Sequence, residues 1–492
     1  MMQLKELLND MKYTVLQGSE QTEITDIVYD TRKIVPGCVF VCIVGTQRDS
    51  HDLAAQAVEL GAAALVIDHT IPMPKDVAVI QVDFTRLAMA KMSVAYFGYP
   101  AQKLTVVGVT GTKGKTTTTH MIKTILEADG RMVGLIGTNG ITIGDQHIET
   151  ANTTPESYEL QKAFANMVKA GCDTVLMEVS SQGLMMERVG GILFDVGVFT
   201  NISPDHIGPG EHPDFADYLH CKGLLFQRCK EGVVNMDDEH VSQLLEGHTC
   251  HITTFGFDFK ADYHTENYEL MQSKDFLGAK FHISGAENLD VCVNMPGKFS
   301  VYNALCAVAT ARVLKVSHQA IQGALERVTV KGRAEMVPIS DDFTILIDYA
   351  HNELSMESLL NTLKAYHPKR MVCIFGCGGN RSKLRRYAMG ECAAKMADFS
   401  VLTEDNNRFE KVEDIIADIK VGMAKGNPDA KYVEIHDRLD AIHYAIDHAE
   451  KGDLIALIGK GHESYRDRMG EKTPFLEREL IEEYARQKGM IE

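Results

Sequence analysis

Residues 104–117 read Leu104-Thr105-Val106-Val107-Gly108-Val109-Thr110-Gly111-Thr112-Lys113-Gly114-Lys115-Thr116-Thr117. The first six residues are mostly apolar and β-branched and predict a buried strand, and an apolar helical pattern follows the last one. Glycines let successive backbone N–H groups point at one anion, beside the positive end of the helix. This order of strand, turn and helix predicts a phosphate-binding loop.

Two side chains of the loop have expected roles. Lys115 would reach the β- and γ-phosphates of ATP, and Thr116 would give its hydroxyl to Mg²⁺. The residues expected to bind ATP here are Gly111, Thr112, Lys113, Gly114, Lys115, Thr116 and Thr117. Val109 stands where the standard spacing has glycine, so the loop is a variant. A glycine-rich turn that only caps a helix is the alternative interpretation. The loop alone does not choose a reaction, because motors, kinases and ligases share it.

The composition is that of an ordinary globular chain, with 45% hydrophobic and 24% charged residues. Its 492 residues predict about three domains. Lysine and arginine number 50 against 68 aspartates and glutamates, a formal net charge of −18. An acidic surface repels a phosphate backbone, so we expect no nucleic-acid partner.

The cysteines and the N-terminus indicate the cellular compartment of the protein. The eleven cysteines have no regular spacing, which favours a reducing environment over a disulfide framework or a zinc knuckle. The first residues predict a short charged helix rather than a signal peptide, and no apolar run is long enough to span a membrane. We therefore expect a cytoplasmic protein without a membrane partner.

Short β-branched runs alternate with helical patterns, which predicts an α/β fold with parallel sheets. We expect three domains: residues 1–98, a central P-loop ATPase-like parallel sheet in 99–332, and a C-terminal doubly wound, Rossmann-like domain in 333–492. The expected strands are 39–43, 64–67, 104–109, 174–179, 196–200, 343–347, 371–375, 399–403 and 454–458, with a helix near 302–314.

Two further side chains are candidates for a metal site in the central segment. Glu178 ends one predicted strand and His206 follows another, and parallel sheets bind ligands at the carboxyl ends of their strands. A carboxylate and an imidazole beside the phosphate loop could complete a magnesium site. Each also has an ordinary interpretation, as a helix cap for Glu178 and as a hydrogen-bonded loop histidine for His206.

Seven motifs together resemble the Mur ligase family. They are Gly111–Thr117, Asn152-Thr153-Thr154-Pro155, Glu178-Val179-Ser180-Ser181, Thr200-Asn201 with Asp205-His206, Tyr218-Leu219-His220-Cys221-Lys222, Asp348-Tyr349-Ala350-His351 and Gly459-Lys460-Gly461-His462-Glu463. Their order is similar to that of the branch that adds the third residue of the peptide stem to a UDP-N-acetylmuramoyl-dipeptide. The similarity covers nearly the whole chain and is loosest in the first segment.

The resemblance implies an ATP-dependent ligase of peptidoglycan synthesis that acts as a monomer and serves cell shape and division. The D-glutamate γ-carboxylate would attack the γ-phosphate of ATP, and the incoming amine would attack the resulting acyl phosphate. The implied catalytic residues are Lys115, Glu178, His206 and Lys222, and the implied magnesium ligands are Thr116, Glu178, His206 and carbamylated Lys222. A carbamate replaces the positive charge of Lys222 with a negative one, whereas a solvated lysine is the usual alternative.

Substrate contacts are also implied by the resemblance. Adenine and ribose would contact Asn303, Arg333 and Asp348, so ATP would lie between domains whose closure completes the site. The UDP-linked substrate would contact Thr31, Asn152, Thr153, Thr154, Ser180 and Arg188, with a uridine pocket around 30–32, 36–37 and 45–51. Thr31 replaces the more usual serine and keeps the hydroxyl. His351 is expected either to approach the phosphates or to cap a helix.

The amino-acid pocket implied by the resemblance consists of Arg381, Asp405, Asn406, Asn407, Arg408, Gly459 and Glu463. Two arginines can bind the second carboxylate of meso-2,6-diaminopimelate and Glu463 its ammonium, and lysine-adding relatives lack the arginine at position 408. The third-residue substrate is therefore expected to be this diamino acid.

Several positions depart from the family pattern, and they keep alternatives open. They are Gln182, Met186, Ser300, Asn380, Asn407 and the loop 208–213. Asn407 replaces a proline that would fix its loop. The alternatives are a divergent paralogue that adds L-lysine or another amino acid, an amide ligase like folylpolyglutamate synthetase, and a catalytically weakened nucleotide-binding regulator.

Overall fold

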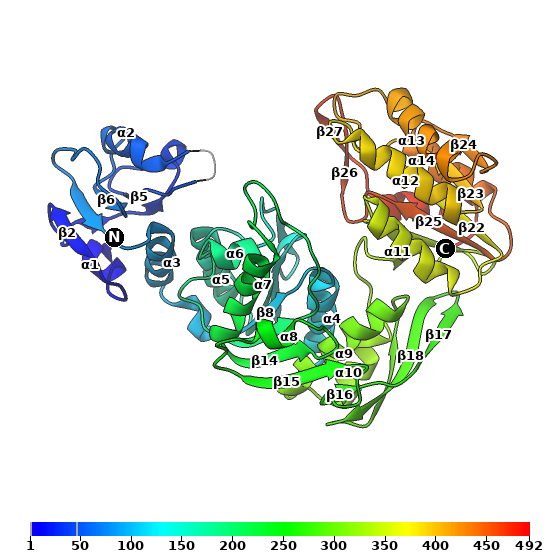
Figure 1. Ribbon diagram of the computed structural model, residues 1–492, viewed down its shortest axis with the longest axis horizontal. Coiled ribbons are helices and arrows are strands. Elements are labelled where there is room, and N and C mark those ends of the chain that lie inside the picture. The colour runs from blue at the N-terminus through cyan, green and yellow to red at the C-terminus, as the bar shows by residue number, and fades with distance from the viewer. Residues whose placement is uncertain (1, 46–47) are drawn as a thin grey trace. The chain divides into compact units, whose positions relative to one another are not determined.

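The computed structural model describes residues 2–45 and 48–492. The chain forms two compact units, one of residues 1–263 with 306–320 and one of residues 264–305 with 321–492. Both contain parallel sheets covered by helices, so the expected α/β class is confirmed (Figure 1). The expected division into three domains, with boundaries after residues 98 and 332, stays a prediction beside this division into two units.

The first sheet of unit one has the strand order β2-β7-β6-β5-β4. Its strands are β2 (Thr14–Gln17), β4 (Ile27–Val28), β5 (Val39–Val41), β6 (Ala64–Ile67) and β7 (Ala78–Gln81), and its helices are α1 (Leu4–Leu7), α2 (Ala54–Glu59) and α3 (Thr85–Tyr96). Strands β4 to β7 run parallel, and β2 is antiparallel. Val39 and Val41 pack toward α1 and α3, whereas Phe40 packs toward α2. This alternation follows from the two-residue period of a strand.

The second sheet of unit one has the order β11-β10-β9-β12-β8-β13-β14-β15. Its strands are β8 (Thr105–Thr110), β9 (Val133–Gly137), β10 (Gly140–Ile143), β11 (Gln146–Ile148), β12 (Thr174–Glu178), β13 (Phe194–Phe199), β14 (Cys229–Asn235) and β15 (His251–Gly256). Its helices are α4 (Lys115–Ala128), α5 (Ser157–Lys169), α6 (Ser181–Met185), α7 (Phe215–Gly223) and α8 (Val241–Leu244). Strands β9, β12, β8, β13, β14 and β15 are parallel. The carboxyl ends of β12, β8 and β13 therefore meet at one edge.

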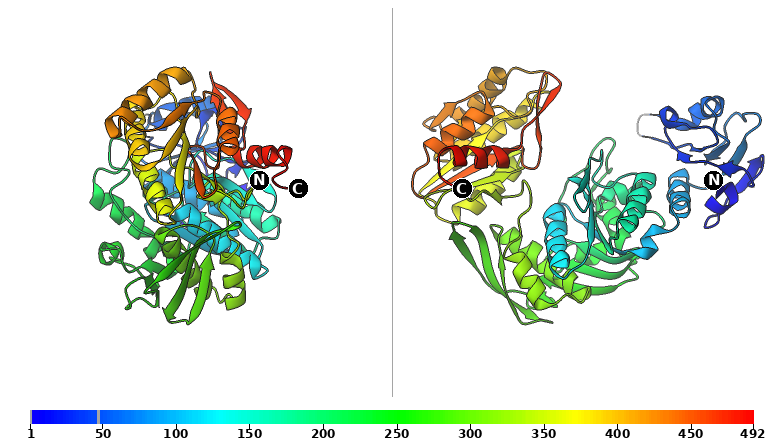
Figure 2. Two further views of the ribbon diagram at one scale, coloured as in Figure 1. Left: turned by 90° about the vertical axis from the view of Figure 1, so that its right-hand side faces the viewer. Right: turned by 180° about the vertical axis from the view of Figure 1, so that it is seen from behind.

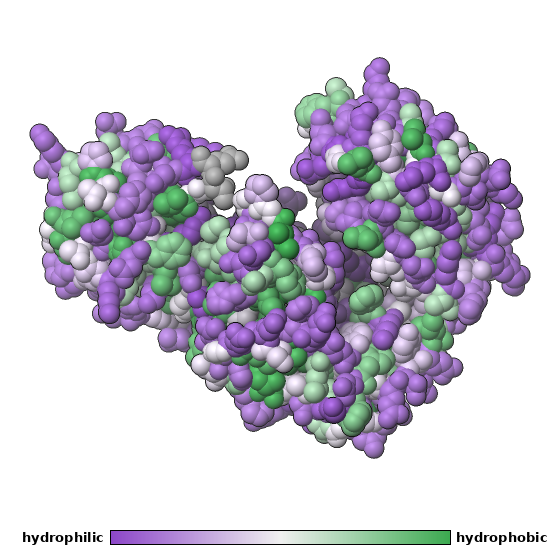
Figure 3. All heavy atoms as spheres, viewed as in Figure 1, coloured by the Kyte–Doolittle hydropathy of each residue, from purple (hydrophilic) through white to green (hydrophobic). Residues whose placement is uncertain are grey.

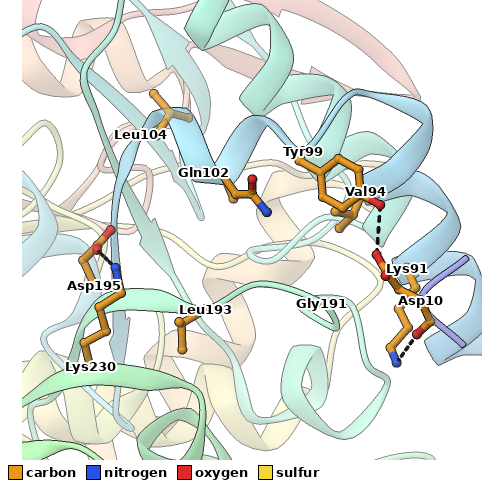
Figure 4. A pocket seen from close by; sticks show the side chains of 11 residues that line it. Asp10, Lys91, Val94, Tyr99, Gln102, Leu104, Gly191, Leu193, Asp195 and Lys230 are labelled. Carbon is orange, nitrogen blue, oxygen red and sulfur yellow. Dashed lines mark hydrogen bonds and ion pairs between the residues drawn. The ribbon is translucent and has the colours of Figure 1, made fainter.

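A cavity of about 400 Å³ lies at the opposite edge of this sheet (Figure 4). Leu104, Asp195 and Lys230 line it from the starts of β8, β13 and β14. The Tyr99 hydroxyl donates to the Asp10 carboxylate at 2.9 Å on its other side. This cavity is therefore distinct from the loops at the carboxyl ends.

Unit two contains a doubly wound sheet of order β20-β21-β25-β22-β23-β24. Its strands are β20 (Glu335–Met336), β21 (Thr344–Asp348), β22 (Arg370–Phe375), β23 (Phe399–Leu402), β24 (Tyr432–Glu434) and β25 (Asp453–Ile458). Helices α11 (Glu353–Lys364), α12 (Lys383–Met396) and α13 (Val412–Gly426) cover one face, and α14 (Arg438–Asp447) and α15 (Glu477–Gln487) cover the other. Figure 2 shows α15 in red on the face seen from behind.

An antiparallel segment also belongs to unit two: β17 (Tyr268–Ser273), β18 (Phe276–Gly285) and β19 (Leu289–Val293). Leu277 shares a core with Leu346 and Leu363, and the Tyr366 hydroxyl donates to the carbonyl of Gly278 at 2.8 Å. The remaining elements include β16 (Tyr263–His264), α9 (Lys298–Val313), α10 (His318–Leu325) and the hairpin β26 (Tyr465–Arg468) and β27 (Glu471–Pro474).

Hydrophilic side chains dominate the face drawn in Figure 3, in keeping with the high content of charged residues. Within residues 2–45 and 48–492, none of the helices combines the length and the apolar character needed to cross a bilayer.

Candidate active site

The turn after β8 has the conformation of a phosphate loop. Gly111 and Gly114 have φ angles of +149° and +86°, which favour glycine, and α4 begins directly after the turn at Lys115. A Cβ on Gly111 would collide with the Thr200 hydroxyl, so this position also requires glycine for space. The predicted strand is found one residue later than expected, at Thr105–Thr110.

Lys115 curls back over the turn from the first residue of α4. Its Nζ donates to the carbonyls of Gly111 at 2.8 Å and Thr112 at 3.2 Å. Thr200 and Asn201 follow β13 and bind the backbone of Lys113. The N–H of Lys113 donates to Oδ1 of Asn201, and its carbonyl oxygen accepts from the Thr200 hydroxyl and from the Asn201 side-chain NH₂. The loop is thus fixed from both sides, and the ammonium of Lys115 lies where an anion in the turn would meet it.

Glu178 lies beside this turn at the carboxyl end of β12. Its side chain is 2% exposed, and its Oε1 accepts from the Thr116 hydroxyl at 2.9 Å and from the backbone N–H of Thr138 at 3.0 Å. The Thr138 hydroxyl donates to Oε2 at 3.2 Å. The carboxylate is therefore held in one orientation next to the first turn of α4.

Lys222 is brought to the same turn by α7. It is 1% exposed, its Nζ donates to the carbonyl of Gly111 at 3.0 Å, and the ring of Tyr218 lies 4.5 Å from Nζ. Burial, and next the positive charge of Lys115, lower the pKa of Lys222 well below its ordinary value. A lysine in these surroundings is unlike the solvated lysine of an amphipathic helix.

His206 is the most exposed of the four residues predicted to be catalytic. Its Nδ1 lies 2.9 Å from Oε1 of Glu211, and its ring centroid is 6.2 Å from that of Tyr218. The Tyr218 hydroxyl is 3.0 Å from the Thr112 hydroxyl, and Lys113 pairs with Asp205 at 3.5 Å. The His206 segment therefore lies against the phosphate loop rather than on a remote surface.

The residues predicted to hold the UDP-linked substrate form a network beside Glu178. The Thr154 hydroxyl donates to the carbonyl of Glu178 at 3.0 Å, and Ser180 caps α6 through the N–H of Gly183. The Arg188 guanidinium donates to Glu156 at 2.9 Å. Thr153 lies 3.2 Å from Thr138 through their hydroxyls, and Asn152 is exposed nearby in sequence.

The predicted uridine pocket is only partly described. Thr31 begins a short 3₁₀ helix whose preceding residue, Asp30, accepts from the N–H of Arg32. Of the predicted stretch 45–51, residues 46–47 lie outside the described residues.

In unit two, the predicted amino-acid residues gather at the carboxyl ends of β23 and β25. The side-chain NH₂ of Asn406 donates to Oε2 of Glu463 at 2.7 Å, and Lys460 donates to Oδ1 of Asn406 at 3.1 Å. Lys460 is completely buried and lies 3.8 Å from Asp405. Burial, and next the charge of Asp405, raise the pKa of Glu463. Gly459 has a φ of +120°, and a Cβ there would meet Asp405.

Two arginines border this cluster. Arg408 donates to the carbonyl of Gly379 at 2.7 Å, and Arg381 is exposed at the turn before α12. Asn407, which replaces a proline of the family pattern, donates to Glu404 at 3.1 Å and is 7% exposed. Asn380 has a φ of +53°, a conformation that asparagine tolerates better than most residues.

The predicted adenine and ribose residues lie in unit two as well. Asp348 accepts from the N–H groups of Ala334 and Ala350, and burial raises its pKa. The Arg333 guanidinium lies 5.1 Å from the ring of Tyr349, and Asn303 is part of α9. The side chain that caps α11 is that of Asn352, and Nδ1 of His351 lies 3.0 Å from the carbonyl oxygen of Tyr349.

Comparisons with known proteins agree with this geometry. Residues 109–311 match the Mur ligase middle domain, and residues 332–461 match the Mur ligase, glutamate ligase domain. The chain is 38% identical over 485 residues to the UDP-N-acetylmuramoyl-L-alanyl-D-glutamate–2,6-diaminopimelate ligase of Clostridium perfringens, covering 97% of this chain and 98% of the relative. The chain belongs to the Mur ligase family.

Two further relatives carry the same name. The protein of Caldanaerobacter subterraneus is 40% identical over 489 residues, and the alignment covers 98% of this chain and 98% of that relative. A solved structure of a UDP-N-acetylmuramoyl-L-alanyl-D-glutamate–2,6-diaminopimelate ligase has a TM-score of 0.73 at 26% identity and covers 99% of both chains. As a Mur ligase, this chain is an ATP-dependent ligase that forms an amide bond.

Three contacts in this Mur ligase were not predicted from the sequence. They are made by Thr138 to Glu178, by Tyr218 to Thr112 and by Lys460 to Asn406. Tyr218 and Lys460 lie inside recognised motifs, so a search for polar residues there could have found them. Thr138 lies in the short turn between β9 and β10, where no sequence signal points to Glu178.

Proposed function

We propose that this Mur ligase joins meso-2,6-diaminopimelate to the D-glutamate of UDP-N-acetylmuramoyl-L-alanyl-D-glutamate in peptidoglycan synthesis. The names of its relatives support the two substrates. The observation that carries the activation step is the convergence of Thr116, Glu178 and Lys222 on the turn 111–114. We also propose that the chain acts as a cytoplasmic monomer.

The residues beside the loop fit Mg²⁺. The oxygens of Thr116 and Glu178 lie 2.9 Å apart and are ligands of the hard type that Mg²⁺ prefers. Glu178, His206 and Lys222, as its carbamate, would hold a second ion. Bound there, Mg²⁺ would neutralise charge on the transferring phosphoryl group.

The chain's own groups would act as follows. Lys115 would bind the β- and γ-phosphates, and the buried Glu178 would keep the Thr116 hydroxyl oriented. The D-glutamate carboxylate would attack the γ-phosphorus and release ADP, forming an acyl phosphate. The amine of the amino acid would then attack the acyl carbon, lose a proton and expel inorganic phosphate. Asn303, Arg333 and Asp348 stay predicted nucleotide contacts.

The direct test is phosphate release from ATP by the purified chain. We expect release only when both UDP-N-acetylmuramoyl-L-alanyl-D-glutamate and meso-2,6-diaminopimelate are present, because activation and amide formation share one acyl phosphate. L-lysine, other amino acids and a folate with glutamate are the comparison substrates. Phosphate release with a folate and glutamate would contradict the proposal. Equal release when neither the UDP-linked dipeptide nor an amino acid is added would contradict it too.

Amino-acid choice is predicted to depend on Arg408. A charge-assisted hydrogen bond to the second carboxylate contributes roughly 1.5–3 kcal/mol, so Arg408→Ala should reduce kcat/KM for diaminopimelate about 10- to 100-fold. L-lysine lacks that carboxylate, and its kcat/KM should change much less. Arg385→Ala on α12 is the matched control. An equal loss for both amino acids would defeat this assignment.

A further inference from the structure

Two histidines and two aspartates form a closed ring of side-chain contacts at one edge of the first sheet of unit one. Asp49 and His51 lie in the segment after β5, and Asp68 and His69 directly follow β6. Because β5 and β6 are parallel neighbours, their carboxyl ends bring these two segments together.

Each imidazole lies between the same two carboxylates. His51 Nδ1 is 2.6 Å from Asp49 Oδ1, and His51 Nε2 is 3.3 Å from Asp68 Oδ1. His69 Nδ1 is 2.8 Å from Asp68 Oδ1, and His69 Nε2 is 3.3 Å from Asp49 Oδ2. The two ring centroids are 3.8 Å apart.

The spacing of these atoms suits a small transition-metal ion. One ligand atom each from Asp49, His51 and His69 lies within 4.8 Å of the other two. Tetrahedral zinc ligands at about 2.0–2.2 Å from the ion are separated by about 3.3–3.6 Å. His51 Nδ1 and His69 Nε2 both face Asp49, and the 3.3 Å between His69 Nε2 and Asp49 Oδ2 is already of that size, so small side-chain rotations would suffice for these three ligands.

Further hydrogen bonds fix the orientation of both carboxylates, as is usual for the groups around a metal ion. The Thr85 hydroxyl donates to Asp68 Oδ2 at 3.0 Å and leaves Oδ1 facing both rings. The backbone N–H of His51 donates to Asp49 at 3.0 Å. The His51 ring is buried, whereas the side chain of His69 is 48% exposed and gives an ion a path from solvent.

We propose that Asp49, His51 and His69 bind a zinc-type metal ion, separate from the phosphate loop. Asp68 would accept hydrogen bonds from the ring nitrogens of His51 and His69 that face away from the ion. Two imidazoles with one carboxylate favour Zn²⁺ over Mg²⁺, which prefers an all-oxygen shell. The ion would be coordinated from both segments and would link the segment after β5 to the segment after β6. His51 ends the stretch 45–51 predicted to hold uridine, so the metal would fix one border of that pocket.

The test is a titration of the full chain, stripped by a chelator, with Co²⁺ and then Zn²⁺. We expect one equivalent of Co²⁺ to give the intense visible absorption of a tetrahedral complex, and Zn²⁺ to displace it. His69→Ala should weaken this binding by at least about 10-fold. Because His69 is half exposed, this variant should fold, and circular dichroism would verify that it does.

Two controls separate this site from others. His206→Ala should keep the tetrahedral band, because His206 belongs to the proposed Mg²⁺ site. His251→Ala removes an exposed histidine that also lies beside a carboxylate, Glu231 at 3.2 Å, and should keep the band too. No tetrahedral band in the wild type, a band unaffected by His69→Ala, or a band lost with His206→Ala would each overturn the proposal.

Discussion

Lys222→Ala is expected to reduce substrate-dependent phosphate release by at least about 10³-fold. The side chain is 1% exposed beside Lys115, and its pKa lies well below the ordinary value because of burial and that neighbouring charge. Deprotonated lysine is the form that adds CO₂, and the carbamate so formed would supply a negative oxygen ligand beside the phosphate loop. Alanine removes that ligand and leaves the turn intact.

Rescue makes this prediction specific. A short carboxylate such as acetate should restore part of the rate of Lys222→Ala, because it can occupy the space of the carbamate. Lys230→Ala is the matched control, since Lys230 is exposed and pairs with Asp195 at 2.7 Å. Removing dissolved CO₂ should lower the wild-type rate and leave the rescued variant unchanged. Wild-type activity in Lys222→Ala would exclude the carbamate role.

The phosphate loop and the position of Glu178 could be predicted from the sequence for a physical reason. Strand, glycine turn and helix are contiguous in residues 104–117, so local geometry determines the turn. Glu178 ends a strand, and parallel strands end at a common edge. The 2.9 Å contact between Thr116 and Glu178 follows from that rule rather than from any local signal.

Other contacts depend on tertiary packing, and the sequence alone could not give them. Lys222 reaches Gly111 only because α7 packs beside the loop, 111 residues further along the chain. The antiparallel strands β17 to β19 were not predicted, although the alternation of Lys280, Phe281, His282 and Ile283 was a readable signal. The roles of the exposed residues Asn152 and Arg381 stay predictions from the resemblance alone.

Glu178→Gln is the second change with a large expected effect. Its amide oxygen can still accept from the N–H of Thr138, so the fold around β12 and the turn after β9 should persist. The negative charge beside Thr116 is lost, however, and a neutral amide is a poor ligand for Mg²⁺. We expect phosphate release to fall about 10²- to 10³-fold, a loss of the size seen when one electrostatic contact to the transition state is removed.

The Mg²⁺ dependence of phosphate release distinguishes loss of a metal ligand from loss of structure. Glu178→Gln should require far more Mg²⁺ for half-maximal release, or fail to saturate, while its thermal unfolding stays near that of the wild type. Thr138→Val removes the hydroxyl contacts to the same carboxylate and to Thr153 but keeps the backbone bond to Glu178, so its Mg²⁺ requirement should rise little. If Glu178→Gln kept the wild-type Mg²⁺ dependence, the carboxylate would serve only to order Thr116 and Thr138. The proposed ion would then need a different ligand at this edge of the sheet.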